Sequence, residues 1–375
     1  MKDYGRTAAY VHLDAVEENF EQMKRNLREG TRMFGVIKTD GYGHGAVPIA
    51  KRMEPKPYLF GFAVAAVSEA LELREQGIQK PILILGYTFP EDYERIVENE
   101  IRPAVVSFAM AKKLSEEAMR QNKTVFIHVA VDTGMSRIGF ADTRESAEEI
   151  LKISCLSNLK IEGVFTHFSK ADESDQTYTM TQLGRFEDFC EELSGLGLKG
   201  VLRHCSNSAA LMQNPRANMD LVRAGISIYG IYPSGEVARE PVRLTPVLEW
   251  KAKVAFVKEI PAGTLVSYGG TFQAPAPMKV ATIPVGYGDG YPRSLSNRGY
   301  ILVQGKRVPI IGRICMDQFM VDVTGLDVQT GEEVTLIGED GGARITVDEM
   351  AALSGRFPYE FVCDIGKRVP RIYLE

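Results

Sequence analysis

Short apolar runs alternate with segments of helical periodicity along roughly the first two thirds of the chain. The runs Met33–Ile37, Leu59–Val64 and Val125–Val131, for example, are each followed by a helical pattern. They are continuously apolar, which is typical of parallel strands buried on both faces. About eight such strand–helix pairs over roughly 225 residues predict an α/β fold with a (β/α)₈ barrel of the TIM type. A doubly wound open sheet is the less favoured alternative, because polar residues follow many different strands rather than one switch point.

The pattern changes near residue 235. Downstream, short β-rich runs such as Val247–Val257, Lys279–Val285 and Glu333–Ile337 are separated by Gly, Pro and Asp, and one helical pattern remains near Val347–Ser354. This change predicts a second, mostly β domain. We therefore expect the barrel over residues 10–235 and the C-terminal β domain over residues 236–375, with residues 1–9 pairing with the β domain.

The composition indicates an ordinary globular protein. Of 375 residues, 45% are hydrophobic and 25% charged, and the net charge of −5 argues against a nucleic-acid partner bound through a broad basic surface. The five cysteines show no C-x-x-C spacing, which favours a reducing compartment and no metal site. No secretion signal and no run of the ~18 to 20 apolar residues of a membrane span are visible. We expect a cytoplasmic protein without a membrane partner.

Lys38 directly follows the apolar run Met33–Ile37 and opens a segment rich in glycine, Gly41 to Gly45. Burial at a strand end lowers the pKa of a lysine, and such a lysine is the usual nucleophile toward a carbonyl cofactor. The glycines allow the backbone to approach a ligand closely. The alternative is a lysine that extends its amine into solvent before a plain turn.

Other polar residues also follow predicted strands, and in a barrel the chemistry lies at the C-terminal strand ends. Three of the five histidines are found there, although a single histidine at such a place is more often structural. Their convergence on one barrel face favours a site. The polar residues at these ends are Lys38, Tyr42, His44, Arg137, His167, His204, Asn207, Ser208 and Arg223.

Gly225-Ile226 opens a short helical pattern near the last barrel strand, which is the usual phosphate site of barrels. Ser208 adds a hydroxyl. A phosphate site together with Lys38 suggests pyridoxal phosphate (PLP). Because an arginine can only donate, Arg223 facing the pyridine nitrogen would leave that nitrogen unprotonated, which suits proton exchange at Cα better than transamination. The alternative for Arg223 is an ordinary ion pair.

Separated segments of the chain carry motifs of one family. They are Val36–Gly45, Asp132–Gly139, Thr166–Phe168, His204–Ser208, Val222–Ile226, Val266–Gly269, Gly286–Gly290, Gly312–Asp317 and Arg368–Arg371. With these motifs in this order, the chain resembles the alanine racemases across nearly its whole length. The resemblance implies a PLP-binding barrel, a C-terminal β domain and a head-to-tail homodimer whose sites are completed by the partner's β domain. It also implies an enzyme that interconverts L- and D-alanine and supplies D-alanine for peptidoglycan.

The resemblance further implies the roles of individual residues. Lys38 holds PLP covalently and is one acid/base, and Tyr268 of the other subunit is the second. The phosphate ligands are Tyr42, Ser208, Gly225, Ile226 and Tyr359. The residues at the cofactor ring are Arg223, His167, His204 and Asn207, of which His204 and Arg223 are candidates to relay positive charge to Tyr268. The substrate residues are Arg137, the Met316 backbone N–H and Tyr287 at the entrance.

Three rival interpretations predict other features. A PLP decarboxylase of the same barrel type needs polar residues that hold a distal ammonium and a cysteine-rich partner loop, which we do not identify. A PLP carrier consisting of the barrel alone would not need a β domain with Tyr268. The third rival is a barrel and β domain with no cofactor, which a cofactor absorbance spectrum distinguishes.

Ala130 departs from the family pattern. Many alanine racemases carry a lysine two residues before the aspartate of the Asp132 motif, and its carbamate positions the substrate-binding arginine. Arg137 lacks that partner here, and a desolvated guanidinium without a counter-charge is costly. We expect either a chloride ion or a carboxylate from elsewhere in the chain beside Arg137. We favour chloride, because no nearby acidic residue can be assigned from the sequence.

Overall fold

The computed structural model describes residues 5–375. They form two compact units. The first, the barrel unit, comprises Val16–Gly41 and Ala46–Thr245. The second, the β unit, comprises the described residues up to Ala15, Tyr42–Gly45 and Pro246–Glu375. Among the described residues, none of the helices combines the length and the apolar character that crossing a bilayer requires.

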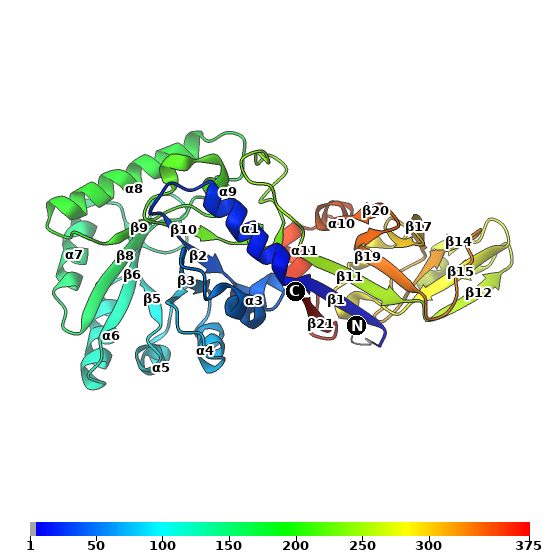
Figure 1. Cartoon of the computed structure of the whole chain (residues 1–375), viewed down its shortest axis with the longest axis horizontal. Coiled ribbons are helices and arrows are strands. Elements are labelled where there is room, and N and C mark those ends of the chain that lie inside the picture. The colour runs from blue at the N-terminus through cyan, green and yellow to red at the C-terminus, as the bar shows by residue number, and fades with distance from the viewer. Residues whose placement is uncertain (1–4) are drawn as a thin grey trace. The chain divides into compact units, whose positions relative to one another are not determined.

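The barrel unit is built around a nearly closed ring of eight parallel strands, in the order β10-β2-β3-β4-β5-β6-β8-β9, with β9 beside β10 (Figure 1). The short strand β7 (Phe140–Ala141) pairs with β6. The predicted barrel is confirmed and the open sheet is wrong. The ring strands are β2 (Arg32–Val36), β3 (Leu59–Val64), β4 (Ile82–Ile84), β5 (Arg102–Val105), β6 (Val125–Asp132), β8 (Leu159–Phe165), β9 (Leu202–His204) and β10 (Leu221–Ala224).

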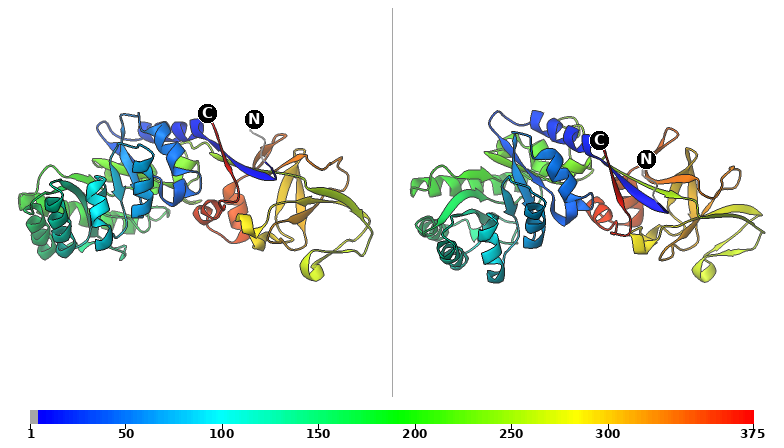
Figure 2. Two further views of the ribbon diagram at one scale, coloured as in Figure 1. Left: turned by 90° about the horizontal axis from the view of Figure 1, so that it is seen from below. Right: turned by 60° about the horizontal axis from the view of Figure 1, so that its bottom comes forward.

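Helices lie outside the strands of this ring (Figures 1 and 2). Helix α6 is representative: Ser107 caps its first turn by accepting from the Met110 N–H, and its buried apolar residues recur along one face toward the strands. The helices are α1 (Leu13–Arg25), α3 (Ala46–Met53), α4 (Val67–Glu75), α5 (Tyr93–Glu98), α6 (Phe108–Arg120), α7 (Arg144–Ser154), α8 (Thr177–Gly195) and α9 (Ser208–Gln213). The 3₁₀ helices are η1 (Pro90–Asp92), η2 (Pro215–Ala217) and η3 (Ile226–Tyr229).

The β unit has one large sheet in the order β12-β15-β18-β17-β16-β19-β11-β1-β21, to which β20 adds beside β19. Strands β13 and β14 form a separate pair. The strands are β1 (Thr7–His12), β11 (Leu248–Lys253), β12 (Phe256–Ile260), β13 (Leu265–Val266), β14 (Phe272–Gln273), β15 (Met278–Ile283), β16 (Tyr300–Val303), β17 (Lys306–Ile311), β18 (Phe319–Asp322), β19 (Glu333–Asp340), β20 (Ala343–Ile345) and β21 (Arg371–Leu374). The helices are α10 (Val347–Ser354), α11 (Pro358–Cys363), η4 (Tyr268–Gly270), η5 (Tyr287–Asp289) and η6 (Arg293–Leu295).

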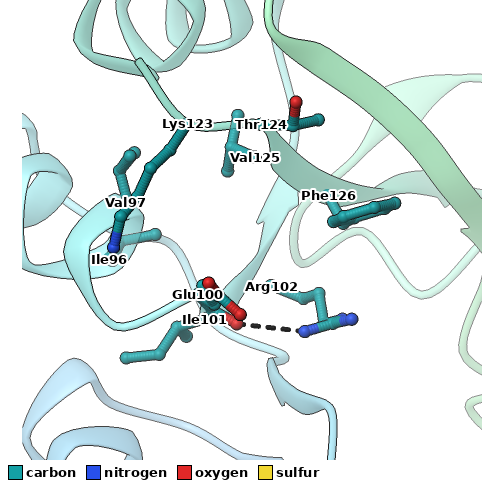
Figure 3. Close-up of a pocket in the computed structure, with 9 residues that line it drawn as sticks. All are labelled: Ile96, Val97, Glu100, Ile101, Arg102, Lys123, Thr124, Val125 and Phe126. Atoms are coloured by element: carbon teal, nitrogen blue, oxygen red, sulfur yellow. Dashed lines mark hydrogen bonds between the residues drawn. The ribbon is translucent and has the colours of Figure 1, made fainter. Parts of the chain in front are cut away.

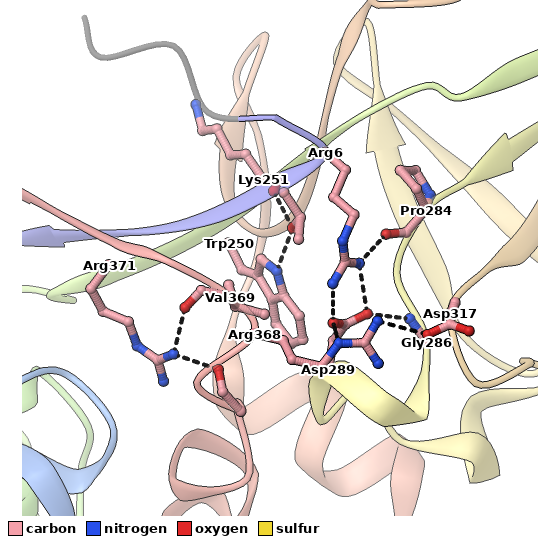
Figure 4. Close-up of polar contacts among 12 residues, drawn as sticks. Arg6, Trp250, Lys251, Pro284, Gly286, Asp289, Asp317, Arg368, Val369 and Arg371 are labelled. Carbon is pink, nitrogen blue, oxygen red and sulfur yellow. Dashed lines mark hydrogen bonds and ion pairs between the residues drawn. The ribbon is translucent and has the colours of Figure 1, made fainter.

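Strand β1 is the first strand of the chain but belongs to the sheet of the β unit. It pairs antiparallel with β11 and parallel with β21. Just before it, Arg6 donates to a carboxylate oxygen of Asp289 at 2.9 Å and to the Pro284 carbonyl at 2.5 Å (Figure 4). The Trp250 indole N–H donates to the Thr7 hydroxyl at 2.9 Å. Arg6 and Thr7 are therefore fixed to segments nearly 250 residues or more away along the sequence.

Candidate active site

Lys38 opens a turn with left-handed backbone. The φ angles of Thr39, Asp40, Gly41 and Tyr42 are 54°, 49°, 61° and 51°. Left-handed conformation costs an L-residue about 1–2 kcal/mol, and only Gly41 escapes this cost. The glycine-rich segment thus begins with one turn of left-handed helix. Strain of this kind persists only where surrounding contacts impose it, and it is concentrated at functional sites.

Two carboxylates hold the strained turn, Glu69 from outside it and Asp40 from within it. One oxygen of Glu69 accepts from the Thr39 N–H at 2.5 Å, and the other accepts from the N–H groups of residues 65 and 66 at 2.8 and 3.0 Å. Asp40 accepts from the Ala46 N–H at 2.8 Å. Glu69 therefore ties the turn to residues 65 and 66, and Asp40 ties it to the start of α3.

The turn continues into residues 42–45 of the β unit. The ring of Tyr42 is buried, and its centroid lies 6.1 Å from that of Tyr359, which stacks on Phe357 at 4.5 Å. Arg371 donates through Nε to the Gly43 carbonyl at 2.9 Å. Its Nη1 donates to the Val369 carbonyl (Figure 4) and to the Gly366 carbonyl, and its Nη2 donates to the Ile365 carbonyl. Arg371 thus joins the segment after Lys38 to the C-terminal part of the chain.

Arg223 on β10 is buried, with 3% of its surface exposed. Nη1 donates to the His204 carbonyl and to His204 Nδ1, both at 2.9 Å. Nη2 donates to the carbonyls of Thr166 and Cys205 at 2.7 and 3.0 Å and to His167 Nδ1 at 3.2 Å. Within residues 5–375 no carboxylate pairs with it and its Nε–H has no acceptor, so it is not in an ordinary ion pair. Burial lowers its pKa to about 10, which leaves it cationic at neutral pH.

Two imidazoles flank this guanidinium. The pKa values of His167 and His204 both lie well below the usual range. Burial is the main cause, and the positive charge of Arg223 is the second. The charges of Arg137 and Lys38 lower the pKa of His167 further. Both rings are therefore neutral at pH 7, and since each accepts from Arg223 at Nδ1, each carries its proton on Nε2. The charges of three cations, Arg223, Arg137 and Lys38, therefore all act on the imidazole of His167.

Arg137 is presented by the loop after β6. One oxygen of Asp132 accepts from the N–H groups of Gly134 and Ser136 at 2.9 and 3.0 Å, which closes the loop. Ser136 has a φ of 56°, so a left-handed residue also precedes this arginine directly. Arg137 is exposed, and no acidic side chain in the described part of the chain forms an ion pair with it.

Donors for an oxyanion gather where η3 begins. Ser208 accepts from the Gly225 and Ser227 N–H groups at 2.9 and 3.4 Å. Ile226 is the first residue of η3, and the first N–H groups of a helix have no acceptor within it. The hydroxyl of Ser227 is buried without a hydrogen-bond partner in residues 5–375. Asn207 caps α9 by accepting from a backbone N–H of its first turn. An anionic group would satisfy the donors left over here.

The predicted residues Tyr268, Tyr287 and Met316 lie in the β unit, on loops that are hydrogen-bonded to one another. The N–H groups of residues 287 and 288 donate to the carbonyls of residues 315 and 316 at 3.1 and 2.9 Å. Ser267 donates to the Arg313 carbonyl at 2.6 Å. The three predicted residues are exposed by 71%, 44% and 53%, respectively. The structure therefore places them together on the surface of this unit.

Ser267, directly before Tyr268, has φ 64° and ψ −174°, a conformation that is essentially restricted to glycine. We expect Ser267→Gly to melt about 2–4 °C above Ser267→Ala. Both variants lose the hydrogen bond to the Arg313 carbonyl, but only glycine relieves the strain. Thermal unfolding of the two purified variants measures the difference. Equal melting temperatures would show that the serine is not strained.

Sequence reasoning missed His128 and Glu162. His128 Nδ1 lies 2.8 Å from His204 Nε2, and Glu162 lies 3.0 Å from the other nitrogen of His128. The available signal was a polar residue inside each of the apolar runs that became β6 and β8. In a parallel strand that is buried on both faces, such a residue needs a buried partner.

Comparison with known proteins decides the family. The sequence model of the alanine racemase N-terminal domain matches residues 11–233, and that of the alanine racemase C-terminal domain matches residues 247–373. The chain belongs to the alanine racemase family. It is 45% identical over 373 residues to alanine racemase 1 of Clostridium acetobutylicum, covering 98% of this chain and 95% of that protein.

Solved structures of alanine racemases are also similar to this member of the family. The enzyme of Clostridium difficile 630 superposes with a TM-score of 0.95 at 38% identity, covering 100% of this chain and 97% of that one. The enzyme of Bartonella henselae, solved with covalently bound pyridoxal phosphate, gives 0.86 at 28% identity and covers 99% and 100%. The family predicted from the motifs is confirmed, whereas the roles of individual residues stay predictions.

Proposed function

We propose that this alanine racemase uses PLP to interconvert L- and D-alanine through two bases, and that it supplies D-alanine for peptidoglycan. The observation that carries the proposal is the buried Ser227 hydroxyl without a partner in residues 5–375, together with three cations, Lys38, Arg137 and Arg223, whose charges all lower the pKa of His167. When bound, PLP serves as an electron sink for the carbanion formed at the substrate Cα.

The residues present fit this cofactor. Lys38 would hold it covalently, and the free Nε–H of Arg223 is a donor without an acceptor in the described residues, as a contact to the pyridine nitrogen requires. His204 and His167 accept from Arg223, and Asn207 caps α9. The unpartnered Ser227 hydroxyl marks the phosphate end. The residues that would bind the phosphate are Tyr42, Ser208, Gly225, Ile226 and Tyr359.

Racemisation removes a proton from one face of Cα and returns one to the other face. Lys38 and Tyr268 would supply the two bases. Tyr268 is 71% exposed and, beside it, Leu265 is 62% exposed. We propose that a second copy of the chain covers them and that each active site is composite.

The substrate would be bound by Arg137 and Met316. The Arg137 guanidinium suits the alanine carboxylate, since it is exposed and carries no ion pair within the described residues. The Met316 N–H donates to no group of residues 5–375, so it can bind a substrate or cofactor oxygen. Tyr287, which is 44% exposed, would line the entrance.

The experiment that tests this function is an assay with each enantiomer in deuterium oxide. We expect L-alanine to yield D-alanine, and the reverse, with deuterium incorporated at Cα. Chiral chromatography with mass spectrometry measures both. A PLP-containing preparation that leaves both enantiomers unchanged would contradict the proposal. Carbon dioxide release from a basic amino acid would favour the decarboxylase instead.

We also propose that a chloride ion stands beside Arg137 in place of the family's carbamate. Ala130 is 2% exposed and packs with Ala104 and Phe165, so it offers no charge. Within residues 5–375, no acidic side chain forms an ion pair with Arg137 or Arg223. The alternative, a carboxylate from elsewhere in the chain beside Arg137, therefore has no support. An excess of cations attracts an anion.

Chloride is expected to lower the KM for alanine severalfold when it is added to chloride-free glutamate buffer, because it positions Arg137. Ala130→Lys, which can be carbamylated, should be independent of chloride. Ala130→Met controls for the size of the lysine side chain in the apolar cluster and should remain dependent. Steady-state kinetics at constant ionic strength measures the effect. A chloride-independent parent enzyme would contradict this proposal.

A further inference from the structure

A chain of hydrogen bonds crosses the interior of the barrel unit from Arg223 to Glu162. Arg223 Nη1 lies 2.9 Å from His204 Nδ1, His204 Nε2 lies 2.8 Å from His128 Nδ1, and His128 Nε2 lies 3.0 Å from Glu162 Oε2. Both histidines are 0% exposed and Arg223 is 3% exposed. The four residues come from β10, β9, β6 and β8, so the chain joins four strands of the ring.

The strands are irregular where they make room for the His128 ring. Ile127 pairs with Ile161, but His128 pairs with Gly163, so Glu162 is the extra residue of a β-bulge in β8. A bulge re-aims a side chain, here the carboxylate that reaches His128. A Cβ on Gly163 would lie 2.7 Å from His128 Cε1, a distance that real Cβ atoms do not show. The bulge at Glu162 and the lack of a side chain at Gly163 together leave the space that the His128 imidazole occupies.

Elementary chemistry determines which group donates and which accepts at each step of this chain of hydrogen bonds. Arg223 can only donate, so His204 accepts at Nδ1 and, when neutral, carries its proton on Nε2. His128 must then accept at Nδ1 and donate from Nε2 to Glu162. Every donor meets an acceptor only if both rings are neutral and Glu162 is ionised. Burial lowers the pKa of both rings, in agreement with this arrangement.

Glu162, at the far end of this chain of hydrogen bonds, lies near the surface and is held there by Arg102. Glu162 Oε2 also accepts from Arg102 Nε at 3.1 Å. Burial raises the pKa of Glu162, but His128 and Arg102 outweigh it, and the net shift is downward. Arg102 lines a pocket of about 290 Å³ together with Lys123 and Phe126 (Figure 3). Glu162 is therefore a carboxylate held from both sides.

We propose that Glu162 and His128 are positioning residues for Arg223. Through His204 they fix the plane of the guanidinium. A carboxylate in direct contact with Arg223 would occupy the donors that the cofactor needs, whereas one three hydrogen bonds away leaves Nε free. This inference rests on the proposed function for the contact of Arg223 with the cofactor.

Three variants of the full-length protein separate positioning from general stability. Glu162→Leu removes the acceptor of His128, whereas Glu162→Gln keeps an oxygen that can accept. Glu17→Leu is the matched control, because Glu17 also holds two cations, Arg52 and Lys56, but is not connected to Arg223. We expect kcat/KM to fall about tenfold in Glu162→Leu and to stay within about threefold of the parent in the other two.

The decisive readout is the ¹⁵N spectrum of histidine-labelled protein, which has five histidines. In the parent, His128 and His204 should both carry the proton on Nε2 and should not titrate between about pH 6 and 9. Both signals should change in Glu162→Leu and remain in Glu17→Leu. A cationic or Nδ1-protonated ring in the parent, or equal activity losses in Glu162→Leu and Glu17→Leu, would overturn the proposal. Parental activity toward alanine tests the proposed function separately.

Discussion

Replacing Lys38 with alanine is expected to abolish racemisation in both directions, by at least about 10⁴-fold. The variant loses both the covalent attachment of the cofactor and one of the two bases. Glu69 and Asp40 hold the left-handed turn after Lys38, so the backbone of the site should persist in the variant. Chiral assays, together with the cofactor absorbance, measure the two losses independently.

Lys51→Ala is the matched control for this prediction. Lys51 is an exposed lysine on α3 whose amine binds the Gln76 side chain at 3.3 Å, and it takes no part in the site. Its variant should keep parental activity and absorbance. If Lys38→Ala racemised alanine at even one hundredth of the parental rate, the assignment of Lys38 as both the attachment point and a base would be wrong.

The barrel and most of its candidate site could be predicted because they depend on local pattern. The apolar run at Leu59–Val64 coincides with β3, since burial on both faces requires continuous apolar sequence. A parallel barrel brings all C-terminal strand ends to one face. The positions of Lys38, Arg137 and Arg223 after predicted strands are therefore enough to make them candidates.

The unpredicted features depend on contacts between distant residues. The left-handed turn includes three non-glycine residues, and its cost is offset by Glu69, which lies 30 residues beyond Thr39. The connection from His128 to Glu162 depends on a register shift between β6 and β8. The pairing of residues 1–9 with the β domain is expected from the sequence, and β1 does pair there with β11 and β21, more than 200 residues away. The register of these pairings depends on contacts that no local pattern specifies.

The proposed composite site predicts a specific recovery of activity from two inactive proteins. Tyr268→Phe keeps the ring but has no proton to transfer, so its activity should fall by about 10²–10⁴-fold. Mixed with Lys38→Ala under conditions of verified subunit exchange, it should restore about a quarter of parental activity. Random exchange makes half of the dimers mixed, and each mixed dimer has one site with both an intact Lys38 and an intact Tyr268.

A second mixture controls for recovery by any other route. Lys38→Ala combined with Arg223→Leu should regain nothing, because both changes lie in the barrel unit and every composite site then contains one of them. Native mass spectrometry of subunits with different isotope labels verifies the exchange. Recovery in both mixtures, or in neither after complete exchange, would contradict sites shared between a barrel unit and a partner's β unit. Recovery in the first mixture alone requires that Tyr268 act on a cofactor held by the other chain.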